Sequence, residues 1–115
     1  MSLPVPGEGR VPNDILILGE APGAEEVATG RPFVGAAGRH LVKLMAKADL
    51  TRADVRIDNL IQTRLPNLNR KKPTKGEVNR ARPDLIRRIN MVKPKVIVAC
   101  GAFALRGLQF PGLVS

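Results

Sequence analysis

The sequence predicts an α/β fold, in which a short and mostly parallel sheet lies between two layers of helices (α/β/α). Three short apolar runs, at 14–18, 55–61 and 95–100, are typical of strands that are buried on both faces. Helical patterns separate these runs along the chain. Because strands that alternate with helices pair in parallel through right-handed crossovers, the order of the elements itself indicates the fold class.

The first long helix is predicted over 37–48. Its apolar residues Leu41, Leu44, Met45 and Ala48 recur at the spacing that places them on one face of a helix. We expect this stripe to pack against the sheet.

The second long helix is predicted to begin after Thr74. Thr74 and Glu77 have the spacing of a capping box, in which each residue satisfies a backbone amide of the other. Pro83 falls inside the pattern and is expected to kink the helix, because it has no amide donor. A last short helix is expected after Gly101. The apolar stripe of the second long helix consists of Val78, Ala81, Leu85 and Ile89.

The length of 115 residues predicts one domain, with an extended lead-in over 1–13 and a single α/β domain over 14–115. With one cysteine, this chain alone cannot build a disulfide framework or a multi-cysteine metal site. No apolar run approaches the ~20 residues of a membrane span, and the first residues do not resemble a secretion signal. We therefore expect a cytoplasmic protein with no membrane partner.

The positive charge is concentrated in one part of the chain. The net charge is +9, and the segment 62–95 holds eleven Lys and Arg residues against two acidic ones, whereas the remainder is balanced. Such a block attracts a polyanion. The alternative is a solvated face that only keeps the protein in solution.

Two segments are expected at the carboxyl ends of the strands, where open α/β sheets bind ligands. The turn 19–23 contains two glycines and a proline, and such a turn can present backbone amides to a ligand. Asn59 follows the second strand. The turn could equally serve packing alone, and neither a GxGxxG nor a GxxxxGK[ST] motif is present.

Three further residues are weighed as site candidates. Phe33, in the loop 30–35, could stack on a planar ring or could fill a gap under the loop. His40 is more typical of a surface or packing position than of a catalytic one. Cys100, at the end of the third run, is expected to behave as a small apolar residue.

Three blocks of sequence resemble the family 4 uracil-DNA glycosylases and their phage polymerase-related relatives. The blocks are 15–26 (ILILGEAPGAEE), 30–35 (GRPFVG, continuing through Ala37 and Gly38) and 93–101 (KPKVIVACG), with Asn59 between the last two. The resemblance implies a uracil-DNA glycosylase-like α/β/α domain that extracts uracil from DNA and hydrolyses its N-glycosidic bond in base excision repair.

The resemblance also implies the roles of individual residues. Phe33 would stack on the base, and the Asn59 carboxamide would read the pyrimidine edge. Backbone groups of Gly19, Ala21 and Gly23 would line the pocket, and Glu20 would place the attacking water. The residues expected at the DNA backbone are Arg64, Arg70, Lys71, Lys72 and Lys75.

The sequence departs from the family pattern in three ways. The family usually holds a four-iron–four-sulfur cluster, but two of its ligand positions are Thr63 and Ala81 here, so we expect no cofactor. The family's His-Pro motif does not occur before Ser115, so we expect reduced or absent hydrolysis. The last strand and helix of the family's sheet are not seen either, which is expected of a fragment, a truncated gene product or a shortened relative. We expect an exposed sheet edge that invites self-association or a partner strand.

Three functions remain open from the sequence. The first is a uracil-DNA glycosylase-like domain with little or no catalysis, which would prefer uracil-containing DNA. The second is a basic nucleic-acid-binding or replication-accessory module, whose binding would depend on salt but not on uracil. The third is a nucleotide-binding protein that uses the glycine-containing turn.

Overall fold

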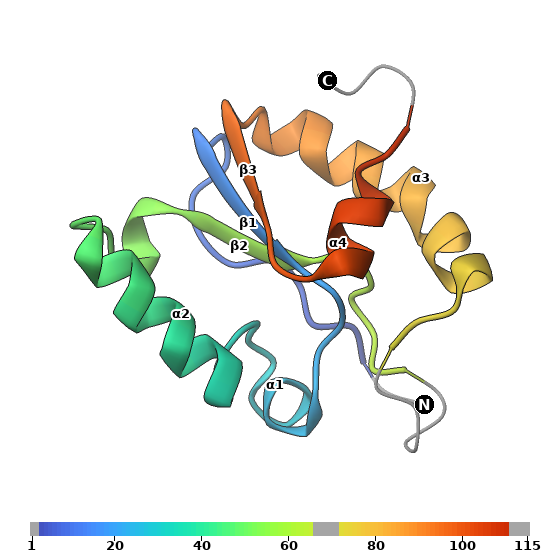
Figure 1. Ribbon diagram of the computed structural model, residues 1–115, viewed down its shortest axis with the longest axis horizontal. Helices are drawn as coiled ribbons and strands as arrows, with labels where there is room; N and C mark the ends of the chain where they lie inside the picture. The colour runs from blue at the N-terminus through green and yellow to red at the C-terminus, as the bar shows by residue number, and fades with distance from the viewer. Residues whose placement is uncertain (1–2, 66–71, 111–115) are drawn as a thin grey trace.

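A three-stranded parallel sheet forms the centre of the computed structural model, which describes residues 3–65 and 72–110. The elements in chain order are β1 (Ile15–Gly19), α1 (Ala24–Thr29), α2 (Ala36–Lys47), the 3₁₀-helix η1 (Arg52–Asp54), β2 (Arg56–Asn59), α3 (Lys75–Val92), β3 (Val96–Ala99) and α4 (Ala102–Gly107). The strand order is β2–β1–β3, and both pairings are parallel (Figure 1). The predicted fold class is therefore confirmed.

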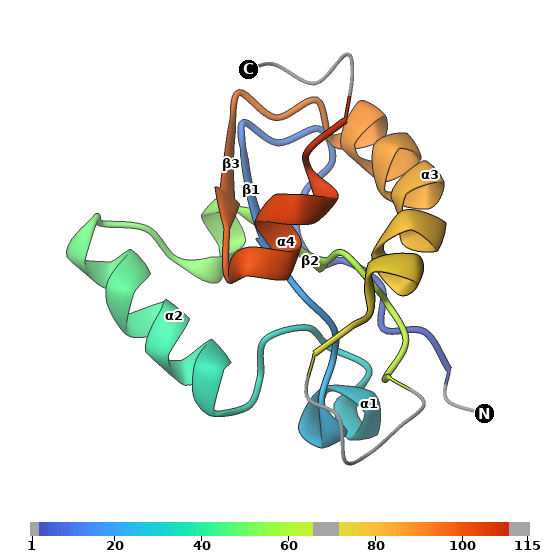
Figure 2. The ribbon, with the colours of Figure 1, turned by 45° about the vertical axis from the view of Figure 1, so that its right-hand side comes forward.

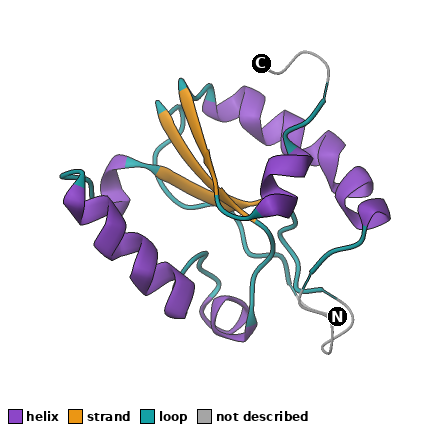
Figure 3. Ribbon diagram, viewed as in Figure 1, coloured by secondary structure: helices purple, strands orange, loops and turns teal. Residues whose placement is uncertain are grey.

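Helices cover both faces of the sheet. Figures 1 and 3 show α2 on one side of the strands, with α3 and α4 on the other. The turned view in Figure 2 keeps the same separation. The short helix α1 lies between β1 and α2 in the chain, in the segment that leaves the carboxyl end of β1.

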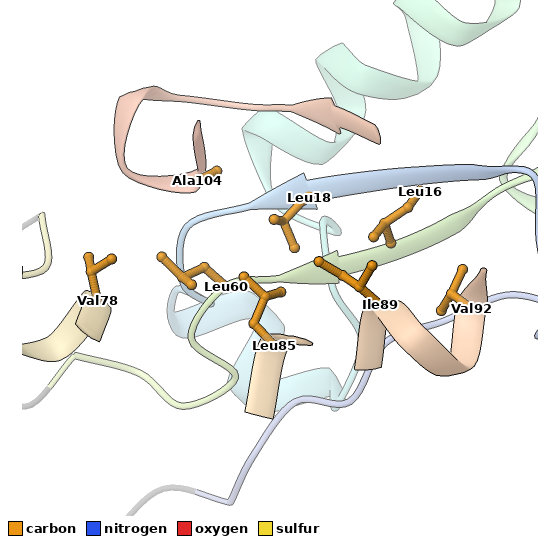
Figure 4. Close-up of a cluster of buried hydrophobic side chains, with 8 residues drawn as sticks. All are labelled: Leu16, Leu18, Leu60, Val78, Leu85, Ile89, Val92 and Ala104. Atoms are coloured by element: carbon orange, nitrogen blue, oxygen red, sulfur yellow. The ribbon is translucent and has the colours of Figure 1, made fainter. Parts of the chain in front are cut away.

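Two apolar clusters hold these layers together, one on each face of the sheet. Alternate residues of β1 point in opposite directions, so Leu16 and Leu18 face α3 whereas Ile17 faces α2. Figure 4 shows the α3-side cluster, in which the stripe of that helix meets β1 and Leu60. This cluster consists of Leu16, Leu18, Leu60, Val78, Leu85, Ile89, Val92 and Ala104.

The two long helices begin within one residue of their predicted starts. In α3, the Thr74 hydroxyl accepts from the Glu77 amide at 3.1 Å, and the Glu77 carboxylate accepts from the Thr74 amide at 2.8 Å. The helix runs unbroken through Pro83. In α2, Leu41 and Met45 are buried, but Leu44 is 48% exposed and Ala48, just after the helix, is exposed too, so the prediction that these two residues join the core was wrong.

The lead-in residues lie against the outer edge of β2. Val5 is buried, and its amide donates to the Gln62 carbonyl at 2.7 Å. Glu8 forms an antiparallel bridge with Ile57, with both backbone hydrogen bonds at 2.8 Å. This segment therefore occupies one edge of the sheet and places the Glu8 side chain beside the loops at its end.

The other edge of the sheet, β3, is open among the described residues. Val96 is 54% and Val98 is 42% exposed, and Val98 lies opposite Ile17 of β1. The α2 layer thus covers β1 and β2 but not the outward part of β3. Self-association at this edge stays a prediction. No helix within 3–65 or 72–110 is both long and apolar enough to cross a membrane.

Candidate functional site: a pocket at the carboxyl ends of the strands

A cavity of about 230 Å³ lies at the carboxyl ends of the strands, and we call it the base pocket after the ligand that the sequence predicts for its residues. It is several times larger than the ~30 Å³ that one water molecule occupies in the liquid. Five of the six residues predicted for catalysis or uracil binding line it. The described residues that line it are Gly19, Glu20, Ala21, Glu26, Phe33, Ala37, Gly38, Asn59 and Cys100.

Asn59 supplies the pocket with a buried carboxamide. The residue ends β2 and is 3% exposed. Its side chain makes no hydrogen bond to any described residue, although both of its polar atoms can form them. Because these polar atoms open onto the pocket, they are available to a polar ligand that enters it.

Phe33 faces Asn59 across Gly19. A Cβ added to Gly19 would lie 2.5 Å from the Asn59 Oδ1 atom and 2.7 Å from the Phe33 Cε2 atom. Such distances are shorter than any ordinary contact, so a side chain at residue 19 would displace one of the two groups. The glycine at the end of β1 is what lets both side chains meet at the pocket.

The backbone of Phe33 is held in an uncommon conformation. Its φ angle is +54°, a region that residues other than glycine seldom adopt. Gly38 in the first turn of α2 packs directly on this backbone, where a Cβ would overlap the Phe33 carbonyl group. The helix and the strained residue therefore fix each other.

Arg52 clamps the same loop from the other side. Its guanidinium donates to the Pro32 and Phe33 carbonyls at 2.7 Å each, and also to the Glu8 carboxylate at 2.8 Å. Glu8 also accepts from Arg31 at 2.6 Å. The pKa of Glu8 lies below its usual range because the hydrogen bonds from Arg31 and then from Arg52 outweigh the effect of burial. No sequence pattern pointed to Arg52.

Glu26 ties the loop that carries Phe33 to α1. Its carboxylate accepts from the amides of Val34 and Gly35 at 2.9 and 2.7 Å, and from the Gly23 amide at 3.0 Å. Burial would raise the pKa of Glu26, but the hydrogen bonds from Gly35, Val34 and Gly23 outweigh it, and the pKa is lowered. The Gly23 amide is therefore bonded to Glu26, and Gly23 does not line the pocket. The other residues predicted to bind uracil do line it.

Glu20 has both carboxylate oxygens engaged at the pocket wall. Oε1 lies 3.0 Å from the Lys72 ammonium, and Oε2 accepts from the Phe103 amide at 3.3 Å. Gly101 packs against Oε2 with a φ of +99°, so a side chain there would be strained and would also collide with the carboxylate. The third block of sequence thus contributes to the site through its final glycine.

The end of β2 is held by a buried ion pair. The Arg88 guanidinium donates to the Asp58 carboxylate at 2.7 Å and to the carbonyls of Asn59 and Leu60 at 2.8 and 2.9 Å. Asp58 accepts in turn from the Asn59 amide at 2.7 Å. Arg88 therefore fixes the backbone on both sides of the Asn59 side chain, although the sequence had placed it only in the basic segment.

Cys100 and His40, which the sequence also offered as site candidates, lie in different environments. Cys100 lines the base pocket, and burial raises the pKa of its thiol. His40 lies exposed on α2 and does not line the pocket.

The basic residues predicted at the DNA backbone are spread over several environments. Lys72 pairs with Glu20, and Lys75 is exposed at the start of α3. Arg64 is exposed and lines a second cavity. Arg70 and Lys71 lie outside the described residues. The basic segment also contains a residue with a structural role, because Arg88 forms a buried ion pair with Asp58.

The residues present do not fit the iron–sulfur cluster that the resemblance implies. Thr63 and Ala81 line one cavity, so the fold does bring these two positions together. Neither side chain has a thiol, and the chain's single cysteine, Cys100, lies at the base pocket instead. The described part of the chain holds no group of three or more His, Cys, Asp or Glu side chains placed to bind a metal ion.

Comparisons with known proteins agree with this geometry. The chain is 42% identical over 105 residues to the type-4 uracil-DNA glycosylase of Pyrobaculum aerophilum, which covers 91% of this chain and 53% of that protein. It is 44% identical over 101 residues to the type-4 enzyme of Thermotoga maritima, covering 88% and 52%. The chain thus spans about half the length of these relatives. Because the family model described as the uracil DNA glycosylase superfamily matches residues 6–112, and the pocket residues lie inside this match, the chain belongs to that superfamily.

Proposed function

We propose that the base pocket binds uracil extruded from DNA. The observation that carries this proposal is the buried Asn59 carboxamide, which has no hydrogen-bond partner among the described residues and faces Phe33 across Gly19. Extrusion of a base costs a few kcal/mol, which stacking and edge contacts in a pocket offset. An aromatic ring beside a carboxamide supplies both kinds of contact.

The edge chemistry of the pyrimidine explains the choice of uracil. Uracil presents a donor at N3 and an acceptor at the 4-position, and one orientation of the Asn59 carboxamide matches both. Cytosine presents an acceptor at N3 and a donor at the 4-position. The same orientation would then place acceptor against acceptor at N3 and donor against donor at the 4-position. Arg88 and Asp58 hold the backbone of Asn59 and thereby limit the adjustments open to its side chain.

The pocket also contains groups suited to hydrolysis. Glu20 is at the wall, and each of its carboxylate oxygens, although engaged by Lys72 or Phe103, has a second lone pair that can position a water molecule for attack on the sugar. The Ala21 amide makes no hydrogen bond to the described residues, so it can donate to a uracil oxygen as negative charge develops there. The relatives carry the name of glycosylases, which supports the same reaction.

Hydrolysis by this chain is proposed to be slow. The leaving uracil carries negative charge, yet the described residues that line the base pocket include no cationic side chain and two carboxylates, Glu20 and Glu26. Loss of a single preorganised donor to such a charge costs about 10²–10³ in rate. The pocket is thus better equipped to recognise uracil than to release it.

The test is an assay of free uracil released from single- and double-stranded oligonucleotides that contain one uracil. We expect uracil release far below the rate of an ordinary enzyme, together with tighter binding of uracil than of cytosine oligonucleotides. Asn59→Ala should remove the binding preference. Asn90→Ala, the same change at an exposed position of α3, is the matched control and should leave it intact.

Two results would count against the proposal. Release of uracil at about 10 s⁻¹ per molecule, a common enzymatic turnover number, would show that the slow-hydrolysis argument is wrong. Equal affinity for uracil and cytosine oligonucleotides, combined with a steep dependence on salt, would favour the basic accessory module instead.

A further inference from the structure

A second cavity, of about 320 Å³, lies between the end of the β2 loop and the beginning of α3. We call it the arginine cavity. Its walls contain two arginines, one threonine and one glutamate, together with apolar side chains. Within the described part of the chain, the lining consists of Ile61, Thr63, Arg64, Leu65, Glu77, Arg80 and Ala81.

The two arginines of this cavity differ from their neighbours in the basic segment. Arg82 donates to the Gly107 carbonyl, Arg87 pairs with Asp84, and Arg88 pairs with Asp58. By contrast, neither Arg64 nor Arg80 forms an ion pair or side-chain hydrogen bond with the described residues. Both are exposed.

The cavity also contains one acidic group, Glu77, whose negative charge opposes an anion but is outnumbered by the two arginines. The Glu77 carboxylate accepts from the Thr74 amide at 2.8 Å, so it is engaged at the start of the helix. The Arg80 guanidinium lies along the first turn of α3, since its Nη1 atom would be 3.3 Å from a Cβ on Gly76. Thr63 adds a hydroxyl donor. Two guanidinium groups and one hydroxyl around a cavity suit the oxygens of a phosphate.

We propose that the arginine cavity binds one phosphate group, held by Arg64, Arg80 and Thr63. The two cavities have neighbouring walls, because the amide of Ile61, in the lining of this cavity, donates to the carbonyl of Glu20, in the lining of the base pocket, at 2.9 Å. A phosphate of the DNA strand that carries the extruded base is therefore the natural source. That source rests on the proposed function, whereas the anion site itself does not. The residues that fail to fit an iron–sulfur cluster would then serve a different ligand.

The test measures binding of a fluorescent single-stranded uracil oligonucleotide over a series of salt concentrations. The variants are Arg64→Gln, Arg80→Gln and the pair, with Arg87→Gln as the control that removes equal charge from an exposed position of α3. Because both arginines would hold the same phosphate, each single change should weaken binding by about tenfold, and the pair by little more. The pair should also lower the salt slope by about 0.7, the value for one phosphate of a single strand.

A second arm uses inorganic phosphate in place of DNA, at constant ionic strength, and follows the backbone amide signals of the labelled protein. Phosphate should shift the signals of residues 63, 64 and 81 in the wild type but not in the double variant. Such shifts without any effect of the variants on oligonucleotide binding would support the site and assign it to a free phosphate compound.

Diffuse attraction predicts a different pattern and would overturn the proposal. In that case Arg87→Gln would weaken oligonucleotide binding as much as Arg80→Gln, and the effects of Arg64→Gln and Arg80→Gln would be additive in the double variant. Inorganic phosphate would shift no amide signals at the cavity. The preference for uracil over cytosine separates this test from the proposed function. It should survive in the Arg64 and Arg80 variants, and its absence in the wild type would refute the base pocket without refuting the phosphate site.

Discussion

The ring of Phe33 and the carboxamide of Asn59 meet over Gly19, where a Cβ would be 2.7 Å from the Phe33 Cε2 atom and 2.5 Å from the Asn59 Oδ1 atom. The two residues are far apart in the sequence, and different elements place them. Clamps at Arg52 and Glu26 hold the Phe33 loop, and Arg88 holds the end of β2. Several parts of the chain therefore build and hold the base pocket.

Replacement of Gly19 by alanine should fill the space between the ring and the carboxamide. We expect the preference for uracil over cytosine to fall at least about tenfold, because one of the two groups must move away. The measurement is competition binding with oligonucleotides that differ in one base. Gly76→Ala is the control, and its nearest neighbour is the flexible end of Arg80. A Gly19→Ala protein with unchanged preference would contradict the close approach of Phe33 and Asn59 to residue 19.

Arg52→Lys tests the clamp on the Phe33 loop. Lysine keeps the charge but cannot reach two carbonyls and a carboxylate at once, so the loop should loosen. We expect a lower melting temperature and weaker binding of uracil oligonucleotides by about tenfold, with the salt slope unchanged. Arg31→Lys, which alters the more exposed partner of Glu8, should have a smaller effect. Equal effects of the two changes would argue against a special role of Arg52.

Loss of the Arg88 guanidinium should destabilise the whole domain. Arg88→Met leaves the Asp58 carboxylate buried without its counter-charge, and the side chain of Asp58 is 5% exposed. Removal of one partner of a buried pair costs about 3–5 kcal/mol, so urea unfolding should show a loss of that order. Arg87→Met, at an exposed pair, should change the free energy of unfolding by less than about 0.5 kcal/mol.

The Glu26 clamp predicts a specific dependence on pH. Because the folded-state pKa of Glu26 is lowered, its contribution to stability is complete above the ordinary carboxyl pKa of about 4.3 and is lost as the pH falls through the folded-state pKa. Glu26→Gln should therefore cost about 1 kcal/mol near neutral pH and progressively less in acid. The measurement is the free energy of unfolding in urea at a series of pH values from 7 down into the acid range. Glu25→Gln, at an exposed residue, is the control. A difference that grows in acid would contradict the lowered pKa.

The sequence predicted the sheet and the two long helices because their signals are local. Apolar runs mark β1 and β3, and the Thr74 capping box marks the start of α3. It did not predict α1, a helix of six residues with none buried, because so short an element leaves no apolar stripe. The exposure of Leu44 depends on how far α2 extends across the sheet, which periodicity alone does not determine.

The site was predicted in part for a similar reason. Phe33, Asn59 and Glu20 are found from motifs that follow strands or lead into a helix. The residues that support them, Arg52 and Arg88, act through hydrogen bonds to distant backbone carbonyls. The sequence does not indicate whether a given arginine faces solvent or donates to a backbone carbonyl. The roles of Arg52 and Arg88 are therefore found only from the structure.

The most direct test of the account is the ratio of affinities for two single-stranded oligonucleotides that differ only by uracil or cytosine at one position. The account predicts a ratio of at least about tenfold in favour of uracil for the wild type, and a ratio near one for Asn59→Ala with its fold intact. A wild-type protein that binds both oligonucleotides equally, or an Asn59→Ala protein that keeps the preference, would contradict it.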